Sequence, residues 1–191
     1  MTSRSKKTYL FKNENFGVRE TLEDDIETWY KWFNDPEVNK YLSPHGNIPN
    51  TLEAQKNFRN RHLSGRNGRI IFSIEESKKN EIIGTCSINI DFLNPARRAE
   101  ISMIIGAKKY CFGPIYLSIN VWLLNHCFNH LNLNSILAGV SEENTVVCLT
   151  LERLGFNKIG KLRSTTFING KYLNSIYYDM LREDWEKNQL K

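Results

Sequence analysis

The middle of this chain has the hydrophobic spacing of β-strands, whereas the segments on either side include runs with helical spacing. Apolar residues dominate residues 69–76 and 81–90, and the polar turn SKKN separates these two runs. Such a pair predicts a β-hairpin, because a short polar turn lets one strand reverse and pair with the next. A second hairpin is predicted where the dipeptide NG, residues 169–170, joins residues 158–168 to residues 171–181.

Three further strands and five helices complete the predicted set of elements. The strands are expected at residues 16–19, 99–106 and 135–140. The helices are expected at residues 22–33, 37–42, 51–63, 115–131 and 145–154, with a loop at residues 43–50. Thr21 is expected to cap the first helix and Gly155 to end the last. Strands interleaved with helices predict an α/β (α+β) fold with a mixed, largely antiparallel central sheet of about seven strands and flanking helices.

The chain is expected to form a single domain over residues 1–191, because it shows no internal repeat and no linker rich in Pro, Gly or Ser. Residues 1–8 are expected to be a flexible basic N-terminus. No apolar run is long enough to span a membrane, and the basic start MTSRSKK is not followed by an apolar signal segment. A cytoplasmic location without membrane contact is therefore predicted.

Neither a metal site nor nucleic-acid binding is predicted. The four cysteines show no CxxC spacing, which favours reduced thiols over a disulfide framework or a zinc site. His126 and His130 have a spacing that can bind a metal, but no third ligand accompanies them. The net charge of +5 is small and scattered, so nucleic acid is an improbable partner. Acidic residues 23–25 suit the first turn of a helix; attraction of a cationic substrate is the alternative.

Several segments, taken in order, carry a family resemblance. These are GVRETLEDDIETWYKWFNDPEVNKYL, AEISMIIG, VSEEN and LERLGF. Together they resemble the GNAT superfamily of acetyl-CoA-dependent N-acetyltransferases, particularly the branch of ribosomal-protein, polyamine and amino-sugar acetyltransferases. The resemblance runs over nearly the whole chain. It implies a GNAT-like sheet whose central strands, residues 99–106 and 135–140, splay apart, with acetyl-CoA as co-substrate in the gap.

The resemblance also implies where the cofactor would lie. Its pantetheine arm would pair with the backbone near Met103, Ile104 and Ile105. Asn144 would contact that arm or an ordered water, and Arg153 would reach the 3′-phosphate. From the residues alone, Asn144 is equally a helix N-cap and Arg153 an exposed helix side chain.

The turn expected to hold the cofactor's diphosphate departs from the family's glycine-rich pattern. The aligned residues are Cys111, Phe112, Gly113, Pro114, Ile115 and Tyr116. Pro114 and Tyr116 stand where the family usually has Gly or Ala, and Cys111 where it has Gln or Arg. Gly113 as a cap followed by proline at the first helical position would still leave the N–H groups of Ile115 and Tyr116 unpaired, so a diphosphate could be held there. Lys108 and Lys109 could add positive charge.

The candidate catalytic residues follow from the chemistry of amide formation. The reaction needs a neutral amine, so a carboxylate base would help; Glu100, on the polar side of residues 99–106, is the choice, and a surface glutamate paired with Arg97 or Arg98 is the alternative. Leu151 stands where many family members have the tyrosine that protonates the leaving thiolate, which leaves water, Tyr116 or Tyr30 for that role. Trp29 and Tyr30 are expected at the acceptor pocket.

The sequence therefore predicts an acyl-CoA-dependent N-acyltransferase that acts by direct attack of a small-molecule amine. A nucleotide-linked amino sugar is the preferred acceptor, followed by a protein N-terminus, whereas a polyamine suits a basic protein less well. The alternative from another class is a GNAT-fold binding or regulatory module with impaired catalysis. A homodimer is possible, and the length of the acyl chain is open.

Overall fold

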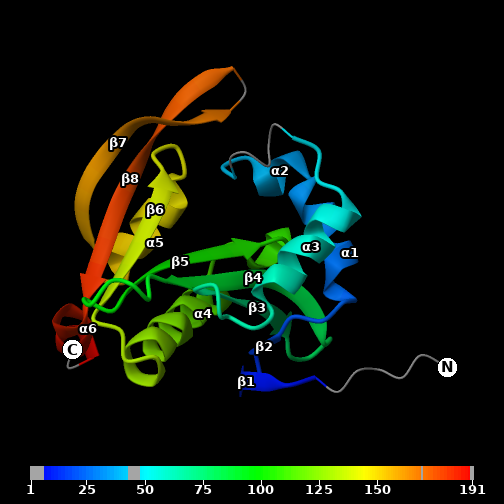
Figure 1. The fold of residues 1–191 in the computed structure, drawn as a ribbon, viewed down its shortest axis with the longest axis horizontal. Coiled ribbons are helices and arrows are strands. Elements are labelled where there is room, and N and C mark those ends of the chain that lie inside the picture. Colours follow the sequence, from blue (N-terminus) through cyan, green and yellow to red (C-terminus); the bar gives the residue numbers. More distant parts are fainter. Residues whose placement is uncertain (1–6, 43–47, 169, 190–191) are drawn as a thin grey trace.

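One eight-stranded sheet forms the centre of the protein, in the order β1-β2-β3-β4-β5-β6-β8-β7. The computed structural model describes residues 7–42, 48–168 and 170–189. The strands are β1 (Tyr9–Lys12), β2 (Phe16–Glu20), β3 (Arg69–Glu76), β4 (Glu81–Ile90), β5 (Arg98–Ile105), β6 (Ser135–Ser141), β7 (Asn157–Ile168) and β8 (Lys171–Leu181). The helices are α1 (Asp25–Phe33), α2 (Pro36–Asn39), α3 (Leu52–His62), α4 (Pro114–Asn125), α5 (Thr145–Arg153) and α6 (Arg182–Gln189). Figure 1 shows their arrangement.

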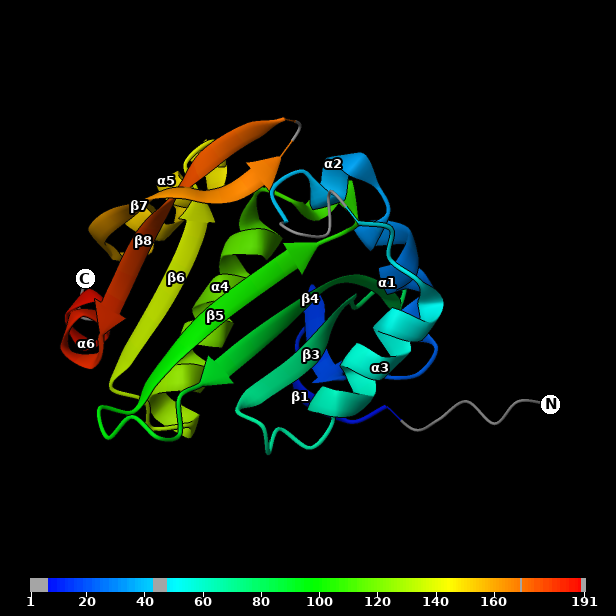
Figure 2. The ribbon, with the colours of Figure 1, turned by 45° about the horizontal axis from the view of Figure 1, so that its top comes forward.

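The two halves of the sheet separate between β5 and β6, as predicted. All neighbouring strands pair antiparallel except these two, which run parallel. Their pairing covers only Arg98–Glu100 and Ser135–Leu137, although both strands continue well beyond it. Figures 1 and 2 show the strands diverging from this point. The backbone groups of β5 that face β6 therefore lose their sheet partner from Ile101 onward.

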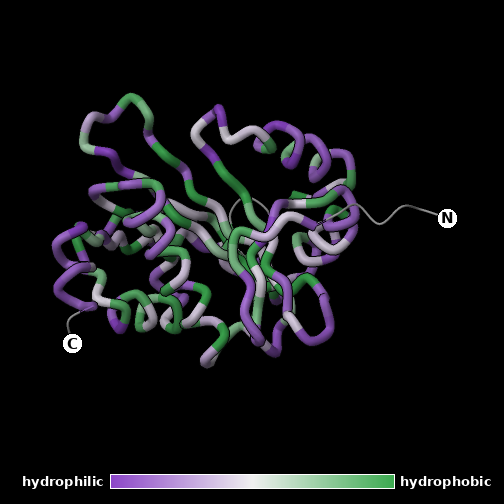
Figure 3. Tube along the Cα trace, turned by 90° about the horizontal axis from the view of Figure 1, so that it is seen from below, coloured by the Kyte–Doolittle hydropathy of each residue, from purple (hydrophilic) through white to green (hydrophobic). Residues whose placement is uncertain are grey.

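One face of the sheet forms the main hydrophobic core. Ala99, Ile136 and Met180 are paired across β5, β6 and β8 and are at most 1% exposed. Helix α4 buries Ile119 and Leu123 in the same core cluster. Figure 2 shows α4 behind β5 and β6, whereas α3 lies in front of β3 on the opposite face. In Figure 3 several apolar segments, drawn in green, run through the centre of the molecule, and others lie nearer its edge.

The opposite face of the central strands is polar. Direct pairing places Arg69, Asn89 and Glu100 in one cross-strand row, and paired residues point to the same face. Ser87 and Ser102 occupy the next row on this face, two residues further along β4 and β5. Helices α1 and α3 cover part of this face through a smaller cluster built on Trp29, Phe33 and Ile71, with Phe58 packed against it. A polar sheet surface beneath aromatic residues is the setting of the site described below.

A buried ion network ties the N-terminal strands to α1. Arg19 binds Asp25 at 2.8 Å and Glu75 at 2.9 Å, and all three side chains are at most 5% exposed. Lys7 and Tyr9 each bind Glu75 at 2.5 Å. Burial by itself would raise the pKa of Glu75, but hydrogen bonds from Lys7, Tyr9 and Arg19 outweigh it and hold that pKa below its ordinary value. Residues 1–6 of the predicted flexible N-terminus lie outside the described residues, whereas Lys7 is held by this network.

Several predicted boundaries need correction. Thr21 does not cap α1, which begins at Asp25. The Asp25 carboxylate accepts a hydrogen bond from the Leu22 N–H and thereby fixes the turn that precedes the helix. The second helix begins one residue earlier than predicted and ends at Asn39, since Asp35 caps it and accepts the Glu37 N–H. The third helix was predicted to start at Thr51; in the structure Thr51 is the N-cap of α3, whose first residue is Leu52. In the loop predicted at residues 43–50, residues 43–47 lie outside the described residues.

Other differences lie in β1, α6 and the end of α4. The short strand β1 and the polar helix α6 were not predicted. The predicted helix over residues 115–131 divides into α4 and a turn of π-helix, His126–His130. The NG hairpin pairs as expected through Ile168 and Lys171, and Gly170 has φ 78°, whereas Asn169 lies outside the described residues.

Candidate functional site

A cavity of about 420 Å³ lies where β5 and β6 separate. Residues from Ile101 to Ile104 and from Ala138 to Ser141 line it, so it begins at the point where the two strands lose their pairing. Aromatic side chains of α1 and α3 close one side, and α4 and α5 contribute the other. The cavity forms because the strand separation leaves a space that no helix fills.

The lining is rich in neutral hydrogen-bonding side chains. They include Thr85, Ser87, Ser102, Asn120, Ser141, Asn144, Thr166 and Ser175, in addition to Trp29, Tyr41 and Tyr116. Ser87 and Ser102 hydrogen-bond to each other at 2.8 Å. Among the lining residues that the structure describes, Arg69 is the only one with a charged side chain. The cavity therefore contains no carboxylate within the described part of the chain.

Three buried polar atoms of lining residues have no hydrogen-bond partner in the described structure. They are Nε1 of Trp29, Oγ of Ser141 and Oγ1 of Thr166. A buried polar group without a partner costs about 1–3 kcal/mol, and native proteins hold few of them. Because all three belong to residues of one cavity, a ligand with polar groups of its own is the natural source of their partners.

The turn before α4 has free backbone donors, as its sequence predicts. Gly113 adopts φ 100° and ψ −165°, Pro114 follows at the first position, and no side chain caps the helix. The N–H groups of Ile115 and Tyr116 consequently have no intrahelical partner. A Cβ placed at Gly113 would meet nothing within 4 Å, so the space before the helix is open. The arrangement fits a diphosphate, which would use these donors and the positive end of the helix dipole.

The two lysines before this turn are occupied elsewhere. Lys108 forms ion pairs with Glu37 and, at 3.1 Å, with Asp35, so it links the turn to α2. Lys109 lies 4.6 Å from the centroid of the Tyr110 ring. Cys111 contacts the Ile105 carbonyl oxygen through Sγ at 3.3 Å, while Phe112 is 62% exposed. Charge assistance from Lys108 would require it to leave its acidic partners.

The sequence-predicted residues fall into two groups in the structure. Residues that line the cavity are Trp29, Met103, Ile104, Tyr116, Asn144 and Leu151. Asn144 stands at the N-cap of α5 without a side-chain cap hydrogen bond. Tyr30 and Arg153 are exposed and do not belong to the lining, and neither do Glu100 and Ile105. Of the tyrosines considered as proton donors, only Tyr116 reaches the cavity; burial raises the pKa of its hydroxyl, which stays protonated at neutral pH.

Glu100 lies beside the cavity rather than within it. Its side chain is exposed and shares the polar face with Ser102, two residues further along β5. Arg97 donates instead to the carbonyl oxygens of Asn132 at 2.6 Å and Leu131 at 2.7 Å. The alternative that the sequence allows for Glu100, in place of a catalytic base, is a surface glutamate paired with Arg97 or Arg98. Within the described structure Glu100 forms an ion pair with neither arginine.

Sequence reasoning missed Arg69, Ser141 and Thr166. Arg69 opens an Ile-rich strand, a position where an arginine usually points into solvent. Ser141 ends β6 and Thr166 lies near the end of β7, on strands that meet the cavity only through long-range pairing. No local signal marks these residues, because the separation of β5 from β6 decides which side chains face the space.

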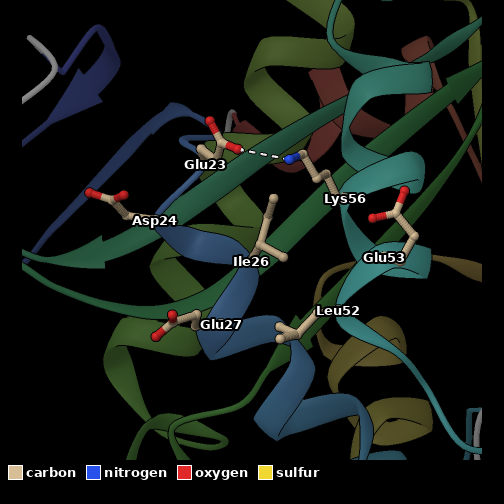
Figure 4. Close-up of a pocket in the computed structure, with 7 residues that line it drawn as sticks. All are labelled: Glu23, Asp24, Ile26, Glu27, Leu52, Glu53 and Lys56. Carbon is tan, nitrogen blue, oxygen red and sulfur yellow. Dashed lines mark ion pairs between the residues drawn. The ribbon is translucent and has the colours of Figure 1, made fainter.

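A second hollow, about 530 Å³ in volume, lies between α1 and α3 (Figure 4). Four acidic residues line it, Glu23, Asp24, Glu27 and Glu53. Lys56 neutralises part of this charge through an ion pair with Glu23 at 3.3 Å. Apart from Ile26 its lining side chains are exposed. Its acidic residues therefore have ordinary roles at helix starts and in a surface ion pair.

Comparison with known proteins identifies the family. A family model described as an acetyltransferase (GNAT) domain matches residues 16–157. The uncharacterized N-acetyltransferase p20 of Bacillus licheniformis is 30% identical over 175 residues, which cover 90% of this chain and 96% of the relative. The chain belongs to the GNAT family of acetyltransferases. The predictions of the fold and of the enzyme class are thereby confirmed, and neither the impaired module nor a protein N-terminal acetyltransferase is favoured.

Further relatives agree with this assignment. The putative ribosomal N-acetyltransferase YdaF of Bacillus subtilis is 32% identical over 98 residues, 51% of this chain and 52% of the relative. Spermidine N-acetyltransferase of Vibrio cholerae, solved in complex with CoA and spermine, has a TM-score of 0.80 at 22% identity and covers 91% of this chain and 99% of its own. A GNAT-family acetyltransferase from Bacillus anthracis has a TM-score of 0.73 at 21% identity, covering 90% and 98%.

GNAT membership makes this protein an acetyltransferase with acetyl-CoA as co-substrate. No group of three or more His, Cys, Asp or Glu residues that could hold a metal occurs in the described part of the chain. Across the same residues, every helix is too short or too polar to span a membrane. The single domain, the homodimer and the cytoplasmic location remain predictions.

Proposed function

We propose that this GNAT enzyme transfers the acetyl group of acetyl-CoA to the primary amine of a nucleotide-linked amino sugar. The composition of the cavity lining supports this acceptor. Hydroxyl and amide side chains of Ser, Thr and Asn are distributed among the apolar and aromatic lining residues, and the described lining includes no carboxylate. A sugar presents several hydroxyl groups that both donate and accept hydrogen bonds, which suits such a surface.

The same lining argues against a polyamine acceptor. A polyamine carries several ammonium groups, and a buried ammonium needs a carboxylate partner because the loss of its hydration is costly. Arg69 in the lining would add repulsion. The spermidine N-acetyltransferase of V. cholerae is 22% identical to this chain, and a likeness at that identity concerns the fold and carries no argument about the acceptor.

The cofactor would lie along the unpaired side of β5. Beyond Glu100 the backbone of β5 pairs only with β4, so the N–H and C=O groups between Met103 and Ile105 that face β6 have no strand partner, and the Ile105 carbonyl oxygen accepts from Cys111 Sγ. The amide groups of the pantetheine arm would complete this interrupted ladder. The diphosphate would then meet the free N–H groups of Ile115 and Tyr116, and the thioester would lie near the start of the strand separation.

The transfer would proceed by direct attack. The amine nitrogen bonds to the thioester carbonyl carbon, the C–S bond breaks, and coenzyme A leaves as a thiolate. Glu100, directly or through water, would take the amine proton, and the thiolate would take a proton from water or Tyr116. Cys86 is the only thiol among the described lining residues; burial raises its pKa, so it stays protonated and is unsuited to act as a nucleophile.

Calorimetry and an acceptor panel test this function. The protein should bind acetyl-CoA with a micromolar Kd, and dephospho-CoA should bind more weakly than CoA. In the presence of acetyl-CoA, a UDP-linked amino hexose should be acetylated with a higher kcat/KM than spermidine or a peptide with a free N-terminus. Absence of acetyl-CoA binding at millimolar concentration would refute the catalytic proposal, and preference for spermidine would refute the acceptor.

A further inference from the structure

Arg69 is a half-buried cation without a partner at the edge of the cavity. It is the first residue of β3, and its side chain lines the cavity. In the described part of the chain its guanidinium forms neither a hydrogen bond nor an ion pair, whereas its backbone N–H donates to Oδ1 of Asn67. By contrast Arg19, Arg59 and Arg97 all donate to carboxylate or carbonyl oxygens.

An unpaired guanidinium in a partly buried position calls for an anion. Removing a charge from water is costly unless a counter-charge or strong hydrogen bonds replace the lost hydration. Arginine has five N–H donors in a planar arrangement that matches the oxygens of phosphate or carboxylate. The uncharged surroundings of Arg69 in the cavity would strengthen its attraction for such a group, because few competing charges are present.

The sheet register places Arg69 away from the expected diphosphate position of the cofactor. Arg69 pairs with Asn89, which pairs with Glu100, so Arg69 is level with the point where β5 and β6 begin to separate. Ile105, which precedes the cofactor turn, lies five residues further along β5. At about 3.3 Å per residue this is about 17 Å along the sheet. An anion at Arg69 would therefore belong to the acceptor rather than to the diphosphate of coenzyme A.

We infer that Arg69 is a specificity-determining residue that binds a phosphate of the acceptor, while the unpartnered groups of Trp29, Ser141 and Thr166 bind its neutral polar groups. This inference rests on the proposed function, because it assumes that the acceptor occupies the cavity. Arg69 lies two strands from Glu100, about 10 Å, a separation that one sugar ring and its phosphate can bridge. The same arginine could bind a carboxylate, so the experiment includes both anions.

The test compares Arg69→Gln with Arg66→Gln, at saturating acetyl-CoA. Arg66 is three residues away, exposed and absent from the cavity lining, so its variant removes the same charge without touching the site. Three acceptors are compared: a UDP-linked amino hexose, an amino hexuronic acid and a neutral amino hexose. In Arg69→Gln the kcat/KM for the UDP-linked sugar should fall about 30-fold, mainly through KM, with little change for the neutral sugar. Arg69→Lys should retain part of the preference, and Arg66→Gln should match the wild type.

Binding of UDP to the protein with CoA present, measured by calorimetry, gives a readout independent of catalysis. Arg69→Gln should weaken it by a similar factor, with an unchanged unfolding midpoint. Equal kcat/KM for the UDP-linked sugar in Arg69→Gln and wild type would overturn the inference and leave the proposed function standing. A larger loss for the hexuronic acid would overturn the phosphate assignment in favour of a carboxylate. If no amine is acetylated, yet UDP binding still depends on Arg69, the acceptor proposal fails and the anion site stands.

Discussion

Substitution of Gly113 by alanine should weaken acetyl-CoA binding through backbone strain alone. Gly113 has φ 100° and ψ −165°, a conformation that only glycine adopts readily. The added Cβ would meet nothing within 4 Å, so steric overlap does not contribute. An alanine held in this region costs about 1–3 kcal/mol. The turn must either bear this cost or move, and movement would displace the N–H groups of Ile115 and Tyr116.

If the diphosphate needs the present shape of the turn, the bound state must bear the strain that the free protein can relax. The Kd for acetyl-CoA should then rise by about 10-fold or more, since 1.4 kcal/mol corresponds to a factor of ten. Calorimetric titration with acetyl-CoA measures this change. Urea denaturation measures how much of the strain the folded protein retains without ligand.

Two matched glycines serve as controls. Gly170 also has a positive φ, 78°, and an open Cβ position, but it lies on the β7–β8 hairpin; Gly170→Ala should lower stability without changing the Kd. Gly160 has an open Cβ position without a positive φ, so Gly160→Ala should change neither quantity appreciably. A wild-type Kd in Gly113→Ala would show that acetyl-CoA does not use this turn and would refute the reasoning.

Three other substitutions test the base, the ion network and the packing of α1. Glu100→Gln should lower kcat about 100-fold near neutral pH, and by a smaller factor at higher pH, where more of the amine is neutral. If the variant and the wild type have the same pH–rate profile between about pH 6 and pH 9, Glu100 is not the base. Glu75→Gln should cost about 3–5 kcal/mol in urea denaturation, because it leaves a buried arginine short of a partner, whereas Glu81→Gln on an exposed strand end should cost less than about 0.5 kcal/mol. The pKa of Glu75 in the folded protein is below its ordinary value of 4.5. The ionised carboxylate therefore stabilises the fold above that pH, and this contribution is lost as the pH falls. The pH dependence of the unfolding free energy below about pH 4.5 should accordingly be weaker in Glu75→Gln than in the wild type. Gly106→Ala would place a Cβ 1.9 Å from Cδ2 of Trp32, so it should destabilise the protein by about 1–3 kcal/mol and shift Trp fluorescence; unchanged stability would mean that Trp32 moves aside freely.

Local sequence patterns predicted much of the secondary structure. The predicted bounds of β3 and β4 agree with the structure, because alternating and apolar runs next to a polar turn specify strands from neighbouring residues alone. The strand β1 has only four residues, and α6 is polar except for Trp185, so neither has a periodic signal of useful length. These elements form because tertiary contacts support them, Trp185 being 4% exposed.

The lining of the candidate site was predicted less completely than the fold. Motif order and the resemblance located the turn at Gly113 and the strand that bears Glu100. The end of the cavity that we propose for the acceptor depends instead on residues brought together by pairing, such as Arg69 with the row that contains Glu100. Tyr30 and Trp29 are adjacent in sequence, yet only Trp29 lines the cavity, because a helix points successive side chains in different directions.

Most of the elements, the mixed sheet and the family could be predicted from the sequence alone, because they follow from short-range periodicity and from the order of motifs; β1 and α6 could not. The tertiary structure decided that β5 and β6 separate after Glu100, that a cavity opens there, and that Arg69, Ser141 and Thr166 face it. The physical reason is the separation along the chain of the residues that interact. Helix and strand preferences arise between residues a few positions apart, whereas an unpaired strand edge and an unpartnered guanidinium result from contacts between segments far apart in the chain.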